Sequence, residues 1–275
     1  MNNQLQNKPK FSLAIQSEGY KRLINNTLGD PKRASKFIAA ISSAVATNSS
    51  LQQCDAGSIL SGALLGEALN LSPSPQLGQY YLVPFKDKAQ FQLGYKGYIQ
   101  LAIRSGQYKD IDVIEVREGE YLGRDKITGK HQFEFIEDEV ERENKPIIGY
   151  MAYFEYLNGF YKNLYWSKEK MQKHALEYSQ AYASDVKKGT NYSFWTKDFN
   201  GMAFKTMLRQ LISKWGIMSI DMQEALTKDM SVVKEDGSYD YVDNQPVMEV
   251  PNEERVEQTA ETTTVEVKQV NINEL

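Results

Sequence analysis

The dipeptide Asn158-Gly159 constrains the fold of this chain more than any other short stretch. Asn-Gly readily adopts the positive φ angles of a two-residue turn between antiparallel strands. Extended segments flank it, over Ile147–Tyr156 and Phe160–Trp166. The sequence therefore predicts a β-hairpin here, and with it an antiparallel sheet.

Other segments are predicted to be extended as well. Gln79–Phe85 and Ala89–Leu93 have the composition of two strands joined by the charged turn Lys86-Asp87-Lys88. Further extended segments are expected around Ile111–Arg117 and His131–Ile136.

Helical signals alternate with these strands. Asp30-Pro31 is a helix start, a capping carboxylate followed by proline at the first helical position. Asp55 caps a second helix, and Pro73 and Pro75 follow that helical pair. The other expected helices lie near Glu18–Leu28, Gly94–Tyr108, Lys168–Ala183, Trp195–Trp215 and Met222–Met230. We predict an α+β fold, in which helices flank an antiparallel sheet and a helical N-terminal segment precedes it.

Charge is distributed unevenly over the 275 residues, whose net charge is −4. Residues 229–275 hold twelve acidic and three basic residues, so residues 1–228 hold 29 basic and 24 acidic ones, a net charge of +5. We expect a flexible Asn/Gln-rich arm over residues 1–29, a folded domain over residues 30–228, and an acidic, mostly disordered tail over residues 229–275. A mildly basic domain is compatible with a polyanionic ligand but is also ordinary.

Composition also bears on location. No stretch approaches the roughly 20 apolar residues that a membrane span needs. The single cysteine, Cys54, cannot form an internal disulfide, and no secretory signal is recognisable. We expect a protein of the reducing cytoplasm.

Groups that would indicate an enzyme are scarce. His131, His174 and Cys54 do not have metal-ligand spacing. Gly123–Lys130 superficially resembles a phosphate-binding loop, but it has one residue too many and is followed by His131 rather than Ser or Thr. It is better interpreted as a turn, and no nucleotide cofactor is expected.

Acidic residues provide the only alternative of an enzymatic kind. Glu115, Glu118 and Glu120 are the conceivable ligands of a metal-dependent nuclease, but they alternate around a turn without a supporting histidine or lysine. Acids around Glu137–Glu143 are read as a solvated loop, so a divalent cation is not indicated.

Two helices present basic faces. In Gly94–Tyr108, Lys96, Gln100 and Arg104 follow at four-residue steps, and Gly97 beside them would let a phosphate approach the backbone. Tyr95 or Tyr98 would offer a stacking face. The alternative is an amphipathic helix with a solvated face and tyrosines in the core.

In Trp195–Trp215, apolar residues from Phe204 to Trp215 form one face. Lys205 and Arg209 lie one turn apart on the other face, where the sequence places no acid nearby except Asp198. An unpaired Lys/Arg pair suits phosphates better than salt bridges, although a solvated face remains the alternative. Lys214 lies at the margin of the apolar face and either serves another surface or snorkels.

Four stretches together resemble the RecT family of phage recombinases. They are Phe37–Pro73, Tyr80–Phe85, Phe91–Tyr108 and Phe194–Trp215, and the resemblance covers most of residues 30–220 but not the segment Asp229–Leu275. Gly94-Tyr95-Lys96-Gly97 and the Lys205-Thr206…Arg209 pattern are its most telling parts.

The resemblance implies a non-enzymatic protein that binds single-stranded DNA and anneals complementary strands without ATP, as a ring or helical filament, in phage homologous recombination and DNA repair. It implies a phage exonuclease partner, and a host single-strand DNA-binding protein is a second expected partner in the bacterial cytoplasm. It also implies a β-sheet and hairpin backed by a long helix, as in Rad52-like annealing proteins, with DNA in a groove between the hairpin and the helix. The DNA-binding residues implied are Tyr95, Lys96, Gly97, Arg104, Trp195, Phe199, Lys205, Arg209 and Lys214. The alternative function is a single-strand coat protein without annealing activity.

Overall fold

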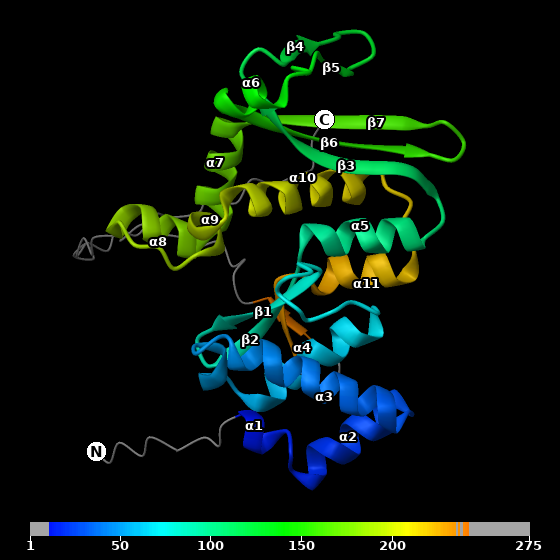
Figure 1. Ribbon diagram of the computed structural model, residues 1–275, viewed down its shortest axis with the longest axis vertical. Helices are drawn as coiled ribbons and strands as arrows, with labels where there is room; N and C mark the ends of the chain where they lie inside the picture. Colours follow the sequence, from blue (N-terminus) through cyan, green and yellow to red (C-terminus); the bar gives the residue numbers. More distant parts are fainter. Residues whose placement is uncertain (1–10, 235, 237–238, 242–275) are drawn as a thin grey trace, which may run out of the picture. The chain divides into compact units, whose positions relative to one another are not determined.

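The computed structural model describes residues 11–234, 236 and 239–241, and its ribbon is drawn in Figure 1. It confirms an α+β fold, in which helices accompany small antiparallel sheets. A β-hairpin backed by a long helix and a helical N-terminal segment are both present, which is consistent with the Rad52-like annealing fold that the resemblance implies.

The N-terminal segment is helical and packed. Helices α1 (Phe11–Ala14), α2 (Glu18–Leu28) and α3 (Pro31–Ala46) follow one another, and the Asp30 carboxylate accepts a hydrogen bond from the Lys32 amide as predicted. Phe11, Ile15 and Ile24 are at most 3% exposed. The prediction of a flexible arm over residues 1–29 is therefore wrong for residues 11–29, because these apolar side chains belong to the core. Residues 1–10 lie outside the described residues.

The first sheet has the strand order β1-β2-β8-β9. Strands β1 (Tyr80–Phe85) and β2 (Lys88–Leu93) form the predicted hairpin, and β8 (Ser231–Val233) and β9 (Tyr239–Tyr241) extend it from the far end of the sequence. The short helix η1 (Leu51–Gln53) and helix α4 (Ala56–Ala68), capped by Asp55, pack beside this sheet.

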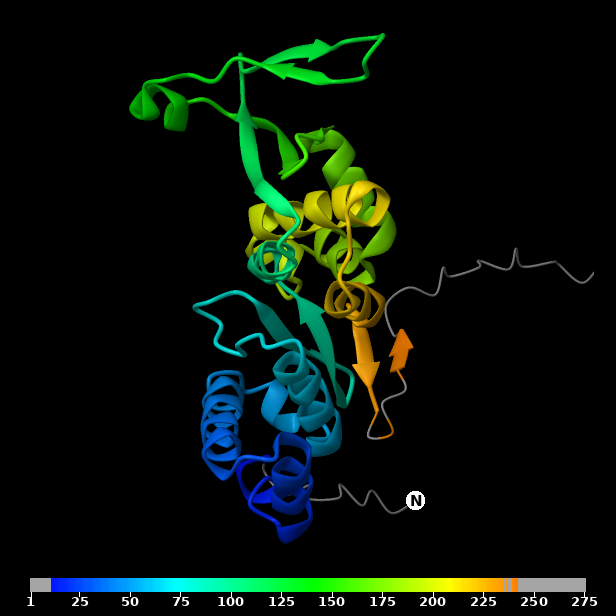
Figure 2. The same cartoon turned by 90° about the vertical axis from the view of Figure 1, so that its right-hand side faces the viewer.

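The second sheet has the order β3-β6-β7, from β3 (Tyr108–Arg117), β6 (Ile147–Tyr156) and β7 (Tyr161–Ser167). The hairpin predicted at Asn158-Gly159 is confirmed, with Gly159 at φ 82° between β6 and β7. Strands β4 (Tyr121–Arg124) and β5 (His131–Phe133) and helix α6 (Glu139–Asn144) form an excursion between β3 and β6 (Figure 2).

Two predicted helices are each divided into two. The segment expected over Lys168–Ala183 forms α7 (Lys168–Tyr178) and α8 (Gln180–Lys188), and Ser179 between them has extended backbone and caps α8. The segment expected over Trp195–Trp215 forms α9 (Phe194–Lys197) and α10 (Phe199–Trp215). Asp198 interrupts the second pair, because its side chain accepts a hydrogen bond from the Gly201 amide at 2.9 Å and starts a new helix. Helices α5 (Tyr95–Arg104) and α11 (Ile220–Lys228) complete the set.

The expected tail does not begin at residue 229. Asp229 is fully buried, and Ser231 pairs with Phe91 of β2. Asp229, β8 and β9 thus belong to the folded domain, and the disorder expected beyond Tyr241 lies outside the described residues. Among the described helices, none is long and apolar enough to cross a membrane.

Candidate nucleic-acid interface

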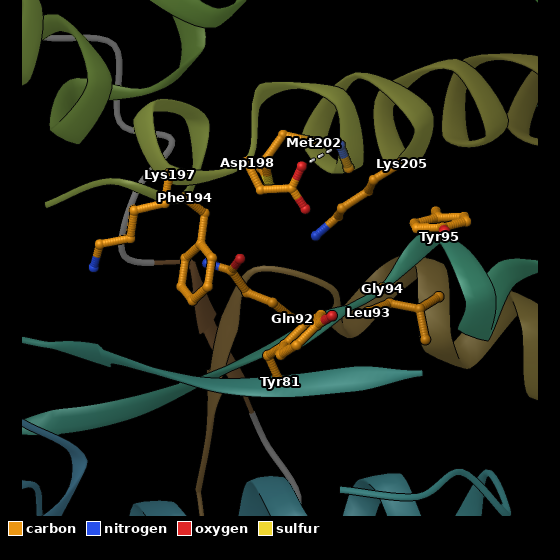
Figure 3. Close-up of a pocket in the computed structure, with 11 residues that line it drawn as sticks. Tyr81, Gln92, Leu93, Gly94, Tyr95, Phe194, Lys197, Asp198, Met202 and Lys205 are labelled. Carbon is orange, nitrogen blue, oxygen red and sulfur yellow. Dashed lines mark hydrogen bonds between the residues drawn. The ribbon is translucent and has the colours of Figure 1, made fainter. Parts of the chain in front are cut away.

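Three neighbouring hollows form a groove, which we call the hairpin–helix groove. Its first two hollows lie between the β1–β2 hairpin and the segment from α8 to α10, and the third continues between α7 and α10. The hollows have volumes of about 200, 520 and 460 Å³ and share lining residues: Met202 borders all three, and Trp195 joins the second to the third. Figure 3 shows the first of them, with Tyr81 and Gln92 of the hairpin facing Met202 and Asp198 across it.

The lining is aromatic and basic. Its cations are Lys197, Lys205 and Arg209, and its one acid among the described lining residues is Asp198, which caps α10. Its aromatic residues are Tyr81, Phe85, Tyr95, Trp166, Tyr178, Tyr192, Phe194 and Trp195. Cations with aromatic faces and few acids suit a single-stranded polynucleotide, whose phosphates and bases need both.

Lys205 and Arg209 meet a common carboxylate. Lys205 Nζ lies 2.9 Å from Asp229 Oδ1, and Arg209 Nη1 lies 2.8 Å from Asp229 Oδ2. The same carboxylate accepts hydrogen bonds from the Leu93 amide at 2.8 Å and the Tyr98 hydroxyl at 3.1 Å. The prediction of an unpaired Lys/Arg pair is wrong, because the acid comes from beyond α11 and not from the helix itself.

Burial separates the two cations. Lys205 is 5% exposed, and desolvation lowers its pKa in spite of Asp229. The Arg209 side chain is 33% exposed and borders the third hollow beside Gln210 and His174. Of the two, Arg209 is placed to meet a ligand, whereas Lys205 holds Asp229 in position.

Asp185 organises the groove wall between α8 and α9. Its carboxylate accepts hydrogen bonds from the Ser193 amide at 2.7 Å and from the hydroxyls of Thr190 at 2.6 Å and Thr196 at 2.7 Å. These hydrogen bonds, with that of Thr190 the largest cause, lower the pKa of Asp185 well below its ordinary value. Asp185 was not among the predicted site residues, because nothing in the surrounding sequence pattern distinguishes it from a surface acid.

Helix α5 lies beside the groove, which only its Tyr95 lines, and a polar face of the helix is exposed to solvent. Lys96, Gln100 and Arg104 are exposed, as the four-residue spacing predicts. The Arg104 guanidinium donates to the carbonyls of Leu69 at 2.9 Å and Asn70 at 3.4 Å, so it also binds the end of α4.

Glycine and tyrosine in α5 have other surroundings than expected. A Cβ on Gly97 would lie 2.1 Å from the Gln79 carbonyl oxygen, so the missing side chain admits the backbone just before β1 rather than a phosphate. Tyr98 is fully buried and is not a stacking face. Tyr95 borders the first hollow, and its ring lies 5.5 Å from that of Phe204.

The remaining predicted residues lie in different places. Trp195 is 6% exposed and lines the groove, and its ring meets Phe199 edge-on at 5.2 Å, so Phe199 packs behind it. Lys214 is exposed at the far end of α10, with its Nζ 5.7 Å from the Trp215 ring and away from the hollows described above. The structure thus brings Tyr95, Trp195, Lys205 and Arg209 to one groove and leaves Lys96, Gly97, Arg104, Phe199 and Lys214 outside its lining.

Two of the three acids considered for a nuclease, Glu115 and Glu120, are engaged in ion pairs. Glu115 pairs with Arg117 at 2.7 Å, and the buried Glu120 pairs with Arg142 at 2.5 Å. No group of three or more His, Cys, Asp or Glu side chains suited to a metal occurs among the residues that the structure describes. The stretch Gly123–Lys130 comprises the end of β4 and the turn that leads to β5, organised by Asp125.

A groove that combines cations with aromatic faces is the kind of surface that single-stranded nucleic-acid-binding proteins use. The model of the RecT family matches residues 35–249, and the chain belongs to that family. RecT family proteins are DNA-binding proteins of recombination and single-strand annealing. The match continues past residue 228 through β8 and β9, which corrects our expectation that the segment from Asp229 lies outside the family resemblance.

Two relatives give the degree of similarity. Uncharacterized protein YqaK of Bacillus subtilis is 39% identical over 221 residues, which cover 78% of this chain and 73% of YqaK. Protein RecT of Escherichia coli is 30% identical over 193 residues, 65% of this chain and 65% of that protein.

Proposed function

We propose that this protein binds single-stranded DNA in the hairpin–helix groove and anneals complementary strands without ATP. The observation that carries the proposal is the groove itself, whose aromatic lining includes the accessible cations Lys197 and Arg209 and one lining acid, Asp198, in a chain of the RecT family. Annealing releases base-pairing energy, so the reaction needs no nucleotide fuel or other cofactor. The protein acts by holding strands extended and by screening the repulsion between phosphates.

The exposed cations and the buried cation have different proposed roles. Arg209 and Lys197 contact phosphates inside the groove, and Lys205 positions Arg209 through their shared partner Asp229. Outside it, the exposed Lys96, Arg104 and Lys214 extend the contact along the backbone of the strand. Backbone contacts of this kind predict binding that is independent of base sequence.

Repetition of the groove is part of the proposal. Many identical subunits, arranged as a ring or helical filament, would hold a strand longer than one groove can. The partners we propose are a phage exonuclease, which supplies the single strand, and a host single-strand DNA-binding protein, in the cytoplasm of a bacterial cell.

A fluorescence assay with two complementary oligonucleotides tests this function. We expect the protein to accelerate pairing equally with and without ATP, and to release no phosphate. Nucleotide-dependent pairing would contradict the mechanism. Slower pairing than in buffer would favour the alternative, a coat protein that protects strands without annealing them. Incubation of labelled DNA with Mg²⁺ is the control for a nuclease, and we expect intact DNA.

A further inference from the structure

The first hollow of the hairpin–helix groove is a small pocket with aromatic surfaces. Its volume is about 200 Å³, below the roughly 300 Å³ of sites that hold drug-sized ligands. In Figure 3, Tyr81 and Gln92 lie on one side, Met202 and Asp198 on the other, and Phe194 and Tyr95 at its two ends. A pocket of this size suits one planar ring system rather than a base pair.

The aromatic surfaces are held in place by the fold. The Tyr81 and Phe194 rings lie 5.9 Å apart at 39°, although one belongs to β1 and the other to α9. Ser193 fixes the start of α9, since its hydroxyl accepts a hydrogen bond from the Thr196 amide and its own amide donates to Asp185. Rings held in this way lose little conformational entropy when a ligand stacks on them.

Polar groups stand at the border of the pocket, where a nucleotide would need them. Lys197 is exposed, and its Nζ lies 5.9 Å from the Phe194 ring centroid, at a position open to a phosphate. Asp198 is already engaged as the cap of α10. Burial, with smaller contributions from Asp198 and Tyr95, raises the pKa of Tyr81, so its ring remains uncharged at neutral pH.

We propose that this pocket binds one unpaired nucleobase of the single strand, stacked against Tyr81 and Phe194, while Lys197 meets the neighbouring phosphate. The inference rests on the proposed function and adds to it a base-binding subsite. One base per subunit is withdrawn from pairing, and the others remain available to a complementary strand. Because every base has a π face, the subsite accepts any base with little preference.

The test compares two ligands with two proteins. Dissociation constants are measured for oligothymidylate and for an abasic oligonucleotide of equal length, which has the same phosphates without bases. Wild-type protein is expected to bind oligothymidylate at least about fivefold more tightly, because a stacked base contributes on the order of 1–3 kcal/mol. Phe194→Leu is expected to lose most of that ratio while binding the abasic strand as the wild type does.

Controls separate the possible failures. Phe160→Leu makes the same change at a half-exposed ring of the β6–β7 hairpin, outside the pocket, and should keep the wild-type ratio. If Phe194→Leu does not fold, judged by circular dichroism, Tyr81→Leu takes its place. Equal affinity of wild-type protein for both strands, or an unchanged ratio in the folded variant, would overturn the subsite. Absence of binding to either strand would instead contradict the proposed function.

Discussion

Helices α5 and α10 carry basic residues at comparable helical spacing, and the structure places them in different surroundings. In α10, Lys205 and Arg209 converge on the buried carboxylate of Asp229. In α5, Lys96 and Arg104 point outward, and within the described residues neither forms an ion pair with an acid. The comparison shows that a basic helix face identifies a surface only after its tertiary partners are known. One face builds the groove wall, and the other remains open to a ligand.

The largest effect is expected at Asp229. Asp229→Asn keeps the side-chain shape but leaves the buried Lys205 ammonium without its counter-charge, which should cost about 3–5 kcal/mol of unfolding free energy. Urea denaturation measures this loss. Adding Lys205→Met should recover part of it, because the unpaired charge is then removed. Glu134→Gln, at an exposed acid, is the control and should change stability by under about 0.5 kcal/mol. If the Asp229→Asn protein is as stable as the wild type, the ion pairs of Asp229 do not distinguish α10 from α5.

A second effect sharpens the description of α5. Gly97→Ala places a methyl group against the Gln79 carbonyl and the Leu93 side chain, and overpacking of this kind should cost about 1–3 kcal/mol. Gly19→Ala in α2, where a Cβ meets nothing within 4 Å, should instead stabilise by about 0.5–1 kcal/mol. Thermal unfolding compares the two. If both variants are equally stable, the space beside Gly97 is open, and a phosphate could approach the backbone there.

On the side of the groove wall, the stability of the protein is expected to depend on pH through Asp185. The folded-state pKa of this carboxyl is depressed, so its stabilising effect is present above the unfolded pKa of about 3.9 and is lost as the pH falls further. Wild-type stability should therefore decline below about pH 4 more steeply than that of Asp185→Asn. Urea midpoints between pH 3 and pH 7 measure the difference. Parallel curves would show that the carboxylate does not hold the groove wall.

The smallest structural effect and a specific binding effect are expected at Lys96. Lys96→Ala should change stability by under about 0.5 kcal/mol, because the side chain is exposed. It should reduce the salt dependence of single-strand binding by about one phosphate contact, a slope change of about 0.7. Arg209→Ala should reduce the slope similarly but also lower stability, since it removes a partner of Asp229. DNA-binding titrations at several salt concentrations measure these slopes. If Lys96→Ala and the wild type show the same salt dependence, α5 does not belong to the DNA site.

Local signals account for what the sequence could predict. Asp30-Pro31, Asp55 and Asn158-Gly159 act on neighbouring backbone, so the elements that they start or join appear where expected. Ser179 and Asp198 lie within continuous apolar patterns, and each caps a new helix there. Periodicity alone merges such pairs, because the apolar face continues across the break.

The site was less predictable because its decisive contacts join distant parts of the sequence. Asp229 follows Arg209 by 20 positions and belongs to a segment whose composition resembles a tail. Tyr81 and Phe194 meet only after β1 and α9 are packed together. The resemblance to the RecT family pointed to α5, α9 and α10, but it could not show which of their residues are buried.

The central claim is that single-stranded DNA lies in the hairpin–helix groove. Photo-cross-linking with an oligonucleotide that carries 4-thiothymidine, followed by mass spectrometry of the linked peptides, tests it most directly. We expect cross-links in the peptides that contain Tyr81, Phe194 and Tyr178, which border the groove. Cross-links confined to the outer face of α5 around Gln100, with none in these peptides, would contradict the account.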